Sequence, residues 1–121
     1  MPKNKWNWDE VKVLVKKRYK GETFGSIAKA LSKERIDALH MDAEIKDFLN
    51  ELNKIRKLES IQDLLKEVLK EFPEAEKARE DIEDCFVSPQ RLSHLEKRPI
   101  VKKFAKTYED ALIEKEVQDT I

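Results

Sequence analysis

Apolar residues recur at helical spacing along most of the chain, and this periodicity constrains the fold more than any other feature. Two sets near the N-terminus follow i, i+3, i+4 and i+7 or i+8, which predicts amphipathic helices over about residues 7–20 and 23–33. The sets are Val11, Leu14, Val15, Tyr19 and Phe24, Ile27, Ala28, Leu31. Gly21 stands where it can end the first helix, and Thr23 can cap the second.

The same spacing predicts three helices in the middle of the chain. We expect a third helix from Asp37 or Asp42 to Lys57, and a fourth that Ser60 caps. The short link between them favours an antiparallel hairpin. A fifth helix over residues 73–85 has a thin apolar face and is expected to be peripheral.

Two more helices are predicted after residue 87. Ser88 and Pro89 have the N-cap and N1 roles of a short helix, and Pro99 opens the last one. The last helix has a broad apolar face, which either packs on the hairpin of the third and fourth helices or pairs with a second copy. No segment alternates with a period of two. The sequence therefore predicts an all-α fold: an N-terminal helix-turn-helix-like module, a helical hairpin and C-terminal helices.

Composition limits the class of protein. The 121 residues contain 41% charged residues but only two glycines and four prolines, so helices with short loops are expected. The single cysteine, Cys85, excludes an internal disulfide, suits a reducing compartment and is expected to be a core thiol with a raised pKa. No apolar run could span a bilayer, and no signal region is evident. These features predict a cytoplasmic protein, or a nuclear one in a eukaryotic host.

The net charge of zero conceals an uneven distribution. Residues 1–35 hold ten Lys and Arg against four Asp and Glu, and residues 36–86 hold eight against fifteen. The predicted division is a basic helix-turn-helix-like segment over residues 1–36, and a helical bundle or oligomerisation region over residues 37–121 that forms one compact unit. The basic N-terminal segment should attract polyanions, whereas the acidic segment over residues 36–86 should repel them.

The N-terminal segment resembles two helix-turn-helix families. Phe24 with the pair Ile27-Ala28 is similar to Myb/SANT-type repeats. A longer, ungapped match resembles the N-terminal domain of GcrA-type bacterial and phage regulators. Its residues are Trp6, Asp9, Val11, Leu14, Gly21, Thr23, Ile27, Ala28 and Leu31. The resemblance covers about residues 6–32 and implies DNA binding through a third, basic helix.

The stretch that would form that third helix is mixed in charge. Lys33, Arg35 and His40 are basic or can become so, but four acids in the same stretch would repel phosphate. These acids are Asp37, Asp42, Glu44 and Asp47. The segment therefore either binds nucleic acid through other cations, binds a protein as SANT-like modules with acidic third helices do, or is only a packing unit.

Basic residues at helical spacing are the candidate nucleic-acid contacts. They comprise a stripe on the first helix, cations of the second helix, and a run near the C-terminus with no acid between its members. The candidates are Lys12, Lys16, Lys17, Lys20, Lys29, Lys33, Arg35, Lys97, Arg98, Lys102, Lys103 and Lys106. They could follow a phosphate backbone, although a solvated lysine face is as common a pattern.

No pattern of catalytic or metal-binding residues is evident. His40 and His94 are far apart in sequence, no phosphate loop is present, and no Cys/His cluster has zinc spacing. The acidic run at residues 80–84 is more typical of a solvated face than of a cation site. The sequence therefore predicts a protein that is not an enzyme and has no cofactor or metal.

Two functional hypotheses follow. The first is a small nucleic-acid-binding protein, most simply a DNA-binding transcription regulator or a viral or mobile-element accessory factor, whose C-terminal helices form a homodimer. Its outline resembles that of small terminase subunits. The alternative is a helical adaptor that binds a protein partner through its acidic third helix.

Overall fold

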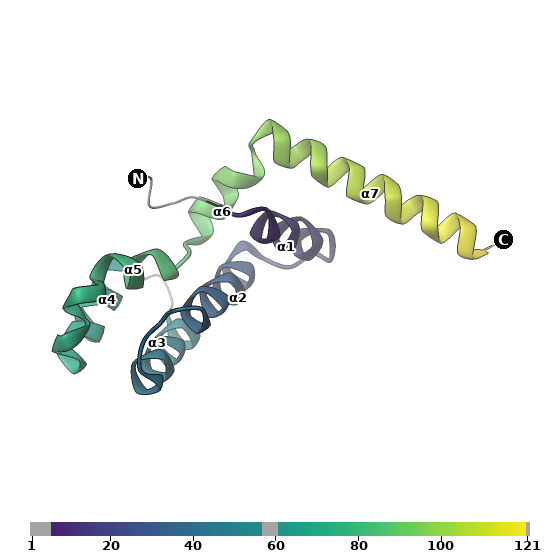
Figure 1. Cartoon of the computed structure of the whole chain (residues 1–121). Helices are drawn as coiled ribbons and strands as arrows, with labels where there is room; N and C mark the ends of the chain where they lie inside the picture. Colours follow the sequence, from purple (N-terminus) through teal and green to yellow (C-terminus); the bar gives the residue numbers. More distant parts are fainter. Residues whose placement is uncertain (1–5, 57–60, 121) are drawn as a thin grey trace. The chain divides into compact units, whose positions relative to one another are not determined.

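Every regular element in the described part of the chain is helical, which confirms the predicted all-α fold class. The computed structural model describes residues 6–56 and 61–120, and the side chains as far as residue 115. The elements, shown in Figure 1, are α1 (Trp8–Tyr19), α2 (Phe24–Asp37), α3 (Ala43–Ile55), α4 (Ile61–Glu71), the 3₁₀ helix η1 (Pro73–Ala78), α5 (Arg79–Cys85), α6 (Pro89–Glu96) and α7 (Pro99–Thr120).

The start of α1 is fixed by a capping box. The Asn7 side chain accepts a hydrogen bond from the Glu10 backbone N–H at 2.8 Å, and the Glu10 carboxylate accepts one from the Asn7 N–H at 3.2 Å. These bonds satisfy two backbone donors that a helix start otherwise leaves unpaired. Glu10 is consequently buried, although it is charged.

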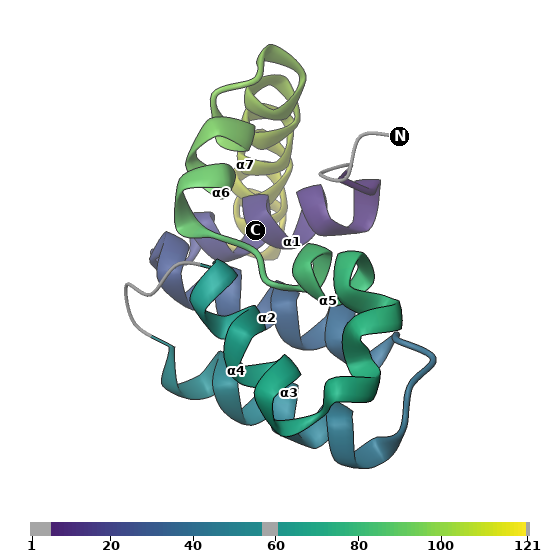
Figure 2. The same ribbon diagram turned by 90° about the vertical axis from the view of Figure 1, so that its left-hand side faces the viewer.

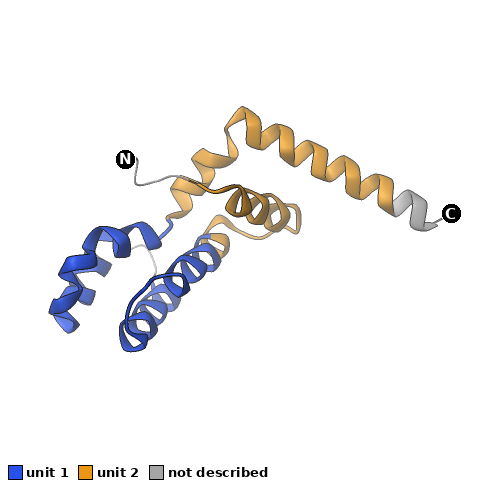
Figure 3. Ribbon diagram, viewed as in Figure 1, with its two compact units in different colours: residues 1–4, 28–87 blue, residues 5–27, 88–121 orange. Residues whose placement is uncertain are grey.

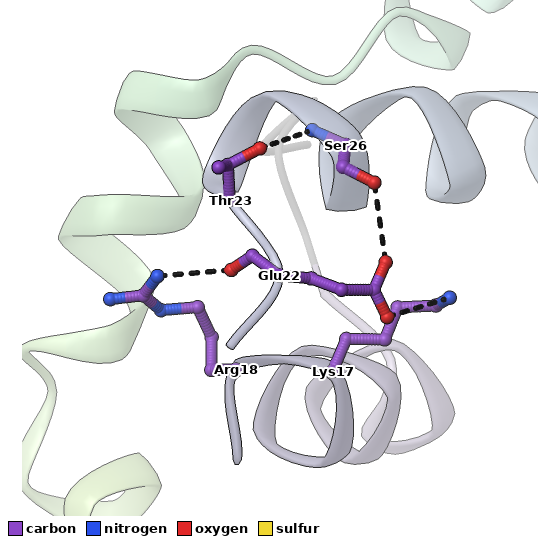
Figure 4. Close-up of polar contacts among 5 residues, drawn as sticks. All are labelled: Lys17, Arg18, Glu22, Thr23 and Ser26. Atoms are coloured by element: carbon purple, nitrogen blue, oxygen red, sulfur yellow. Dashed lines mark hydrogen bonds and ion pairs between the residues drawn. The ribbon is translucent and has the colours of Figure 1, made fainter. Parts of the chain in front are cut away.

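The end of α1 is a Schellman motif built on Gly21. Gly21 has a φ of 85°, and its N–H donates to the Arg18 carbonyl while the Glu22 N–H donates to the Lys17 carbonyl. Thr23 then accepts a hydrogen bond from the Ser26 N–H at 3.2 Å and caps α2 (Figure 4). The roles predicted for Gly21 and Thr23 are therefore confirmed.

Most of the other predicted helix starts are also confirmed. Ser88 caps α6 by accepting from the Arg91 N–H, with Pro89 in the first turn, and Pro99 opens α7. The third helix begins after Asp42, so the earlier start at Asp37 is wrong because α2 continues to that residue. The capping role predicted for Ser60 lies outside the described residues.

The expectation of one peripheral helix over residues 73–85 is wrong in two respects. Pro73 opens a 3₁₀ helix, and α5 follows as a separate short helix. Three of its side chains, Ala75, Ile82 and Cys85, are buried, so the segment contributes to the core. Its apolar face is thin because these side chains are few, but all three are excluded from water.

The described residues form two compact units (Figure 3). Unit 1 contains residues 28–87, and unit 2 contains residues 6–27 and 88–120. The unit boundary runs through α2, and the chain returns to unit 2 after residue 87. The sequence predicts one boundary after residue 36, whereas these units divide at residues 27 and 87. The difference arises because segments distant in sequence pack together in unit 2.

Unit 1 has an apolar core to which α4 contributes most. Helix α4 contacts α3, η1 and α5 (Figure 2). The core residues are Ile36, Ile45, Leu49, Leu64, Leu65, Val68, Ala75, Ile82, Cys85 and Phe86. Phe48 and Phe72 meet edge to face beside it, with ring centroids 5.5 Å apart. The predicted contact between the third and fourth helices is therefore present.

The second half of α2 pairs with α3 in an antiparallel arrangement held by polar contacts. At one end, Lys29 donates to the Lys54 carbonyl at 3.0 Å and its own carbonyl accepts from Asn53 at 2.8 Å. At the other end, the Asp37 carbonyl accepts from Lys46 at 3.0 Å. Lys29 and Lys46 thus supply donors to the last carbonyls of the facing helix, where cations are favoured.

Unit 2 consists of α1 packed on α6 and α7. Val101 of α7 is buried, and Phe104 and Tyr108 each meet an aromatic ring of α1 edge to face. Helix α1 therefore covers the part of the apolar face that Val101, Phe104 and Tyr108 form, whereas Ile100 and Ile113 stay exposed. The sequence predicts that the hairpin of the third and fourth helices or a second copy covers this face; within unit 2 the covering helix is α1.

Candidate nucleic-acid interface

The three candidate cations of α2 make contacts within unit 1. Lys29 donates to the end of α3, as described above, and Lys33 pairs with Asp37 at 2.6 Å. The Arg35 guanidinium donates to the Asp84 carbonyl at 2.7 Å. The three side chains therefore interact with groups of unit 1 itself. The structure does not bring them into one compact unit with the cations of α1.

The cations of α1 divide into two groups. Lys17 pairs with Glu22 at 3.5 Å (Figure 4), and Arg18 pairs with Glu96 of α6 at 2.9 Å. Arg18 also lies over the Phe24 ring, 4.1 Å from its centroid, and donates to the Glu22 carbonyl. Lys17 therefore contacts the α1–α2 turn, and Arg18 contacts both this turn and α6.

The other three lysines make no ion pair or hydrogen bond with any residue that the structure describes: Lys12, Lys16 and Lys20. Lys16 and Lys20 are exposed, and Lys12 is half-buried. Their spacing of i, i+4 and i+8 places them along one side of α1. Their charges are thus available to an anion from outside.

Two aromatic side chains lie on the same side of α1 as these lysines. Trp8 and Tyr19 are 46% and 47% exposed, and they flank Lys12 and Lys16 at i, i+4, i+8 and i+11. Trp8, Lys12, Lys16, Tyr19 and Lys20 are called the α1 stripe below. Asp9 is the one exposed carboxylate of α1 and lies in its first turn, where the helix dipole favours an acid.

A second group of cations spans the end of α6 and the start of α7. All five members are exposed, and none forms an ion pair with a described residue. They are Lys97, Arg98, Lys102, Lys103 and Lys106, called the α7 cluster below. On the helical spacing of α7, Lys102, Lys103 and Lys106 lie away from the apolar side that meets α1. The cluster is thus a second cationic surface of unit 2.

The two compact units differ in charge. Residues 28–87 hold 11 Lys and Arg against 16 Asp and Glu, a net charge of −5. Residues 6–27 and 88–120 hold 12 against 9, a net charge of +3. The lysines of the α1 stripe and the α7 cluster both lie in the positive unit. A polyanion is therefore attracted to unit 2 and repelled by unit 1.

The acids predicted for the third helix belong to unit 1 and are not equivalent. Hydrogen bonds from Lys33 and Asn50 hold the pKa of the Asp37 carboxyl below its usual value. The Asp37 carboxylate therefore already has hydrogen-bond donors within unit 1. Asp42, Glu44 and Asp47 are exposed on α3 and its N-cap.

Histidine and cysteine, the side chains that most often bind metal ions or act in catalysis, lie in different environments in the described residues. His40 and His94 are exposed, and no three His, Cys, Asp or Glu side chains in the described ranges converge to hold a metal ion. Cys85 is a buried free thiol, which confirms the predicted core position. Burial, with smaller contributions from Asp84 and Asp81, raises its pKa to about 12, so it stays protonated near neutral pH.

No family model, curated protein or solved structure matches the chain. None of the helices in the described residues is both long and apolar enough to cross a bilayer. The resemblance to Myb/SANT-type and GcrA-type modules stays a prediction.

Sequence reasoning missed the aromatic part of the α1 stripe. The helical spacing predicts that Tyr19 belongs to the apolar face with Val11. In the structure nearly half of Tyr19 is exposed, since it lies at the edge of that face and at the end of the helix. The signal that could have identified the stripe is Trp8, Lys12, Lys16 and Tyr19 at successive helical turns.

Proposed function

We propose that the chain is a small, non-enzymatic nucleic-acid-binding protein whose unit 2 contacts backbone phosphates. The observation that carries this proposal is the contrast among the cations. Lys17, Arg18, Lys29, Lys33 and Arg35 interact with groups of the chain itself, whereas the α1 stripe and the α7 cluster hold eight cations without a described partner. Lysine ammonium groups bind phosphates as point charges, so the affinity should depend strongly on salt.

The proposal is tested by fluorescence anisotropy with labelled nucleic acids at about 50 mM salt, where phosphate contacts are strong. One variant changes Lys12, Lys16 and Lys20 to Gln, and a second changes Lys102, Lys103 and Lys106 to Gln. A matched control makes the same change at three exposed lysines of unit 1: Lys66, Lys70 and Lys77. All three variants lose the same charge, so only the position of the lost charges differs.

The expected result is weaker binding for both unit 2 variants and unchanged or slightly altered binding for the unit 1 control. Circular dichroism melts confirm that each variant is folded. Absence of binding by the unmodified protein at low salt contradicts the proposal. Equal weakening in all three variants contradicts the assignment to unit 2, because it would show that only the net charge matters.

A second candidate function is favoured by the exposed acids of α3. Asp42, Glu44 and Asp47 face solvent in a unit of net negative charge, so a basic protein segment is a suitable partner. A labelled lysine-rich peptide, titrated in the absence of nucleic acid, tests this adaptor role. Binding that is lost when these three acids become Asn or Gln supports it, and absence of binding at low salt contradicts it.

A further inference from the structure

We propose that the nucleic acid bound by unit 2 is single-stranded, and that its bases stack on Trp8 and Tyr19. This inference rests on the proposed function and specifies its substrate class. Proteins that bind single strands combine cations that follow the backbone with aromatic rings on which bases stack. The α1 stripe contains both kinds of side chain on one side of one helix.

Both rings of the stripe are held in place while nearly half of each side chain remains exposed. Trp8 meets Phe104 of α7 at a centroid distance of 5.1 Å and an interplanar angle of 67°. Tyr19 meets Tyr108 at 5.8 Å and 90°. An edge-to-face contact occupies at most one face of a ring. Each ring is therefore fixed before binding, and stacking a base on it costs little conformational entropy.

The cations lie between and beside the two rings. Trp8 and Tyr19 are eleven positions apart, which corresponds to about 16 Å along the axis of an α-helix. Lys12 and Lys16 lie in this interval, and Lys20 follows Tyr19 directly. A strand that follows the lysines with its phosphates can thus place two separated bases on the two rings.

Space for a base exists beside Tyr19. A cleft of about 220 Å³ lies among α1, α6 and α7, and Tyr19 and Tyr108 are among the residues that line it. Leu14, Val15 and Val101 belong to its apolar lining, and Arg18, Glu96 and Glu109 are its charged lining residues. In a duplex the base faces are covered by their neighbours in the stack, so these rings can contribute only to the binding of unpaired bases.

The test compares three labelled probes of equal length: an oligothymidine, an abasic strand with the same backbone, and a duplex. The oligothymidine is expected to bind at least about tenfold more tightly than the abasic strand, because stacking on an aromatic side chain has an effect of that size. Tyr19→Leu should reduce this preference, whereas Tyr19→Phe, which keeps the ring, should preserve it.

Tryptophan fluorescence gives a second readout. The chain has two tryptophans, so Trp6→Phe leaves Trp8 as the only one. Oligothymidine should quench its emission, and the abasic strand should leave it unchanged. This measurement needs no substitution at Trp8 itself, so the contact between Trp8 and Phe104 stays intact.

The outcomes separate this inference from the proposed function. Equal affinity for the oligothymidine and the abasic strand, with unquenched Trp8, overturns the stacking inference and leaves phosphate binding intact. Tighter binding of the duplex than of the single strand also overturns it. Failure to bind any of the three probes at low salt overturns both proposals together.

Discussion

Ser32 makes three hydrogen bonds from a fully buried position in unit 1. Its hydroxyl donates to the Ala28 carbonyl at 2.7 Å and accepts from the Val87 N–H at 2.8 Å and from the Arg56 guanidinium at 3.1 Å. One donor and two acceptors are all that a hydroxyl offers. Arg56 is itself buried, which lowers its pKa, and it lies over the Phe86 ring. This single hydroxyl thus satisfies groups from three segments of the unit.

Replacement of Ser32 by Ala should lower the free energy of unfolding by about 2–4 kcal/mol, because it leaves a backbone N–H and part of a guanidinium buried without their acceptor. Urea unfolding measures this value. The matched control is Ser26→Ala, which removes one exposed hydrogen bond to Glu22 and should cost less than about 0.5 kcal/mol. Equal effects of the two substitutions would show that the buried contacts of Ser32 do not stabilise the fold.

Cys85 should resist thiol reagents in the folded protein at about pH 8 and react rapidly after unfolding, because its thiol is buried and protonated. Its pKa rises from 9.0 to about 12 on folding. Above pH 9.0 the unfolded chain therefore releases this proton before the folded protein does, and stability falls as the pH rises toward 12. Cys85→Ala should reduce this alkaline loss. Rapid native-state labelling would contradict the buried position.

The helices are defined by their ends as much as by their apolar faces. The capping box of Asn7, the Schellman motif at Gly21 and the Ser88 N-cap each satisfy backbone groups that the helix leaves open. Because these signals are local, they act without contacts from distant segments. The two glycines of the chain have different local roles and provide a direct test.

Gly21→Ala and Gly25→Ala should change stability in opposite directions. Gly21 has a φ of 85°, which strains any residue with a Cβ, so its replacement should cost about 1 kcal/mol. Gly25 lies inside α2, and a Cβ there would meet only the Thr23 hydroxyl at 3.9 Å. Its replacement should stabilise the protein by about 0.5–1 kcal/mol. Thermal melts of the two variants measure both changes in stability. A stabilising effect of Gly21→Ala would contradict the left-handed conformation of Gly21 at the end of α1.

The docking of α7 on α1 should depend on Phe104 and not on Lys103. Phe104→Ala removes a half-buried ring that meets Trp8 and should cost about 1–3 kcal/mol. Lys103→Ala should change stability by less than about 0.5 kcal/mol and weaken only polyanion binding. Urea unfolding, with light scattering to detect a dimer, separates these effects. An unchanged melting temperature and mass for Phe104→Ala would mean that α7 is not packed on α1.

The molecule separates its charge between its two units, and this property was only partly evident from the sequence. The basic N-terminus and acidic middle could be counted directly, because charge follows from composition. The sequence could not show that residues after 87 join residues 6–27 in one positively charged unit. This grouping depends on the long-range packing of α6 and α7 on α1. The predicted boundary at residue 36 followed local composition and did not anticipate this grouping.

Helix positions were predictable where a local signal exists. Thr23, Ser88 and Pro99 mark helix starts through capping and proline geometry. Burial was less predictable, because Ile82 and Cys85 reach the core only through contacts of α5 with α4. The sequence suggested all twelve candidate cations equally, but it could not show which of them pair within the fold.

The most direct test of phosphate binding by unit 2 is the salt dependence of single-strand affinity. Binding constants are measured by anisotropy across a series of salt concentrations for the unmodified protein and for the Lys12, Lys16 and Lys20 to Gln variant. For the unmodified protein the logarithm of the binding constant should fall linearly with the logarithm of salt, by about 0.7 for each phosphate contacted. The slope of the variant should be shallower by about 2. Affinity that is independent of salt, or identical slopes for the two proteins, would contradict the account.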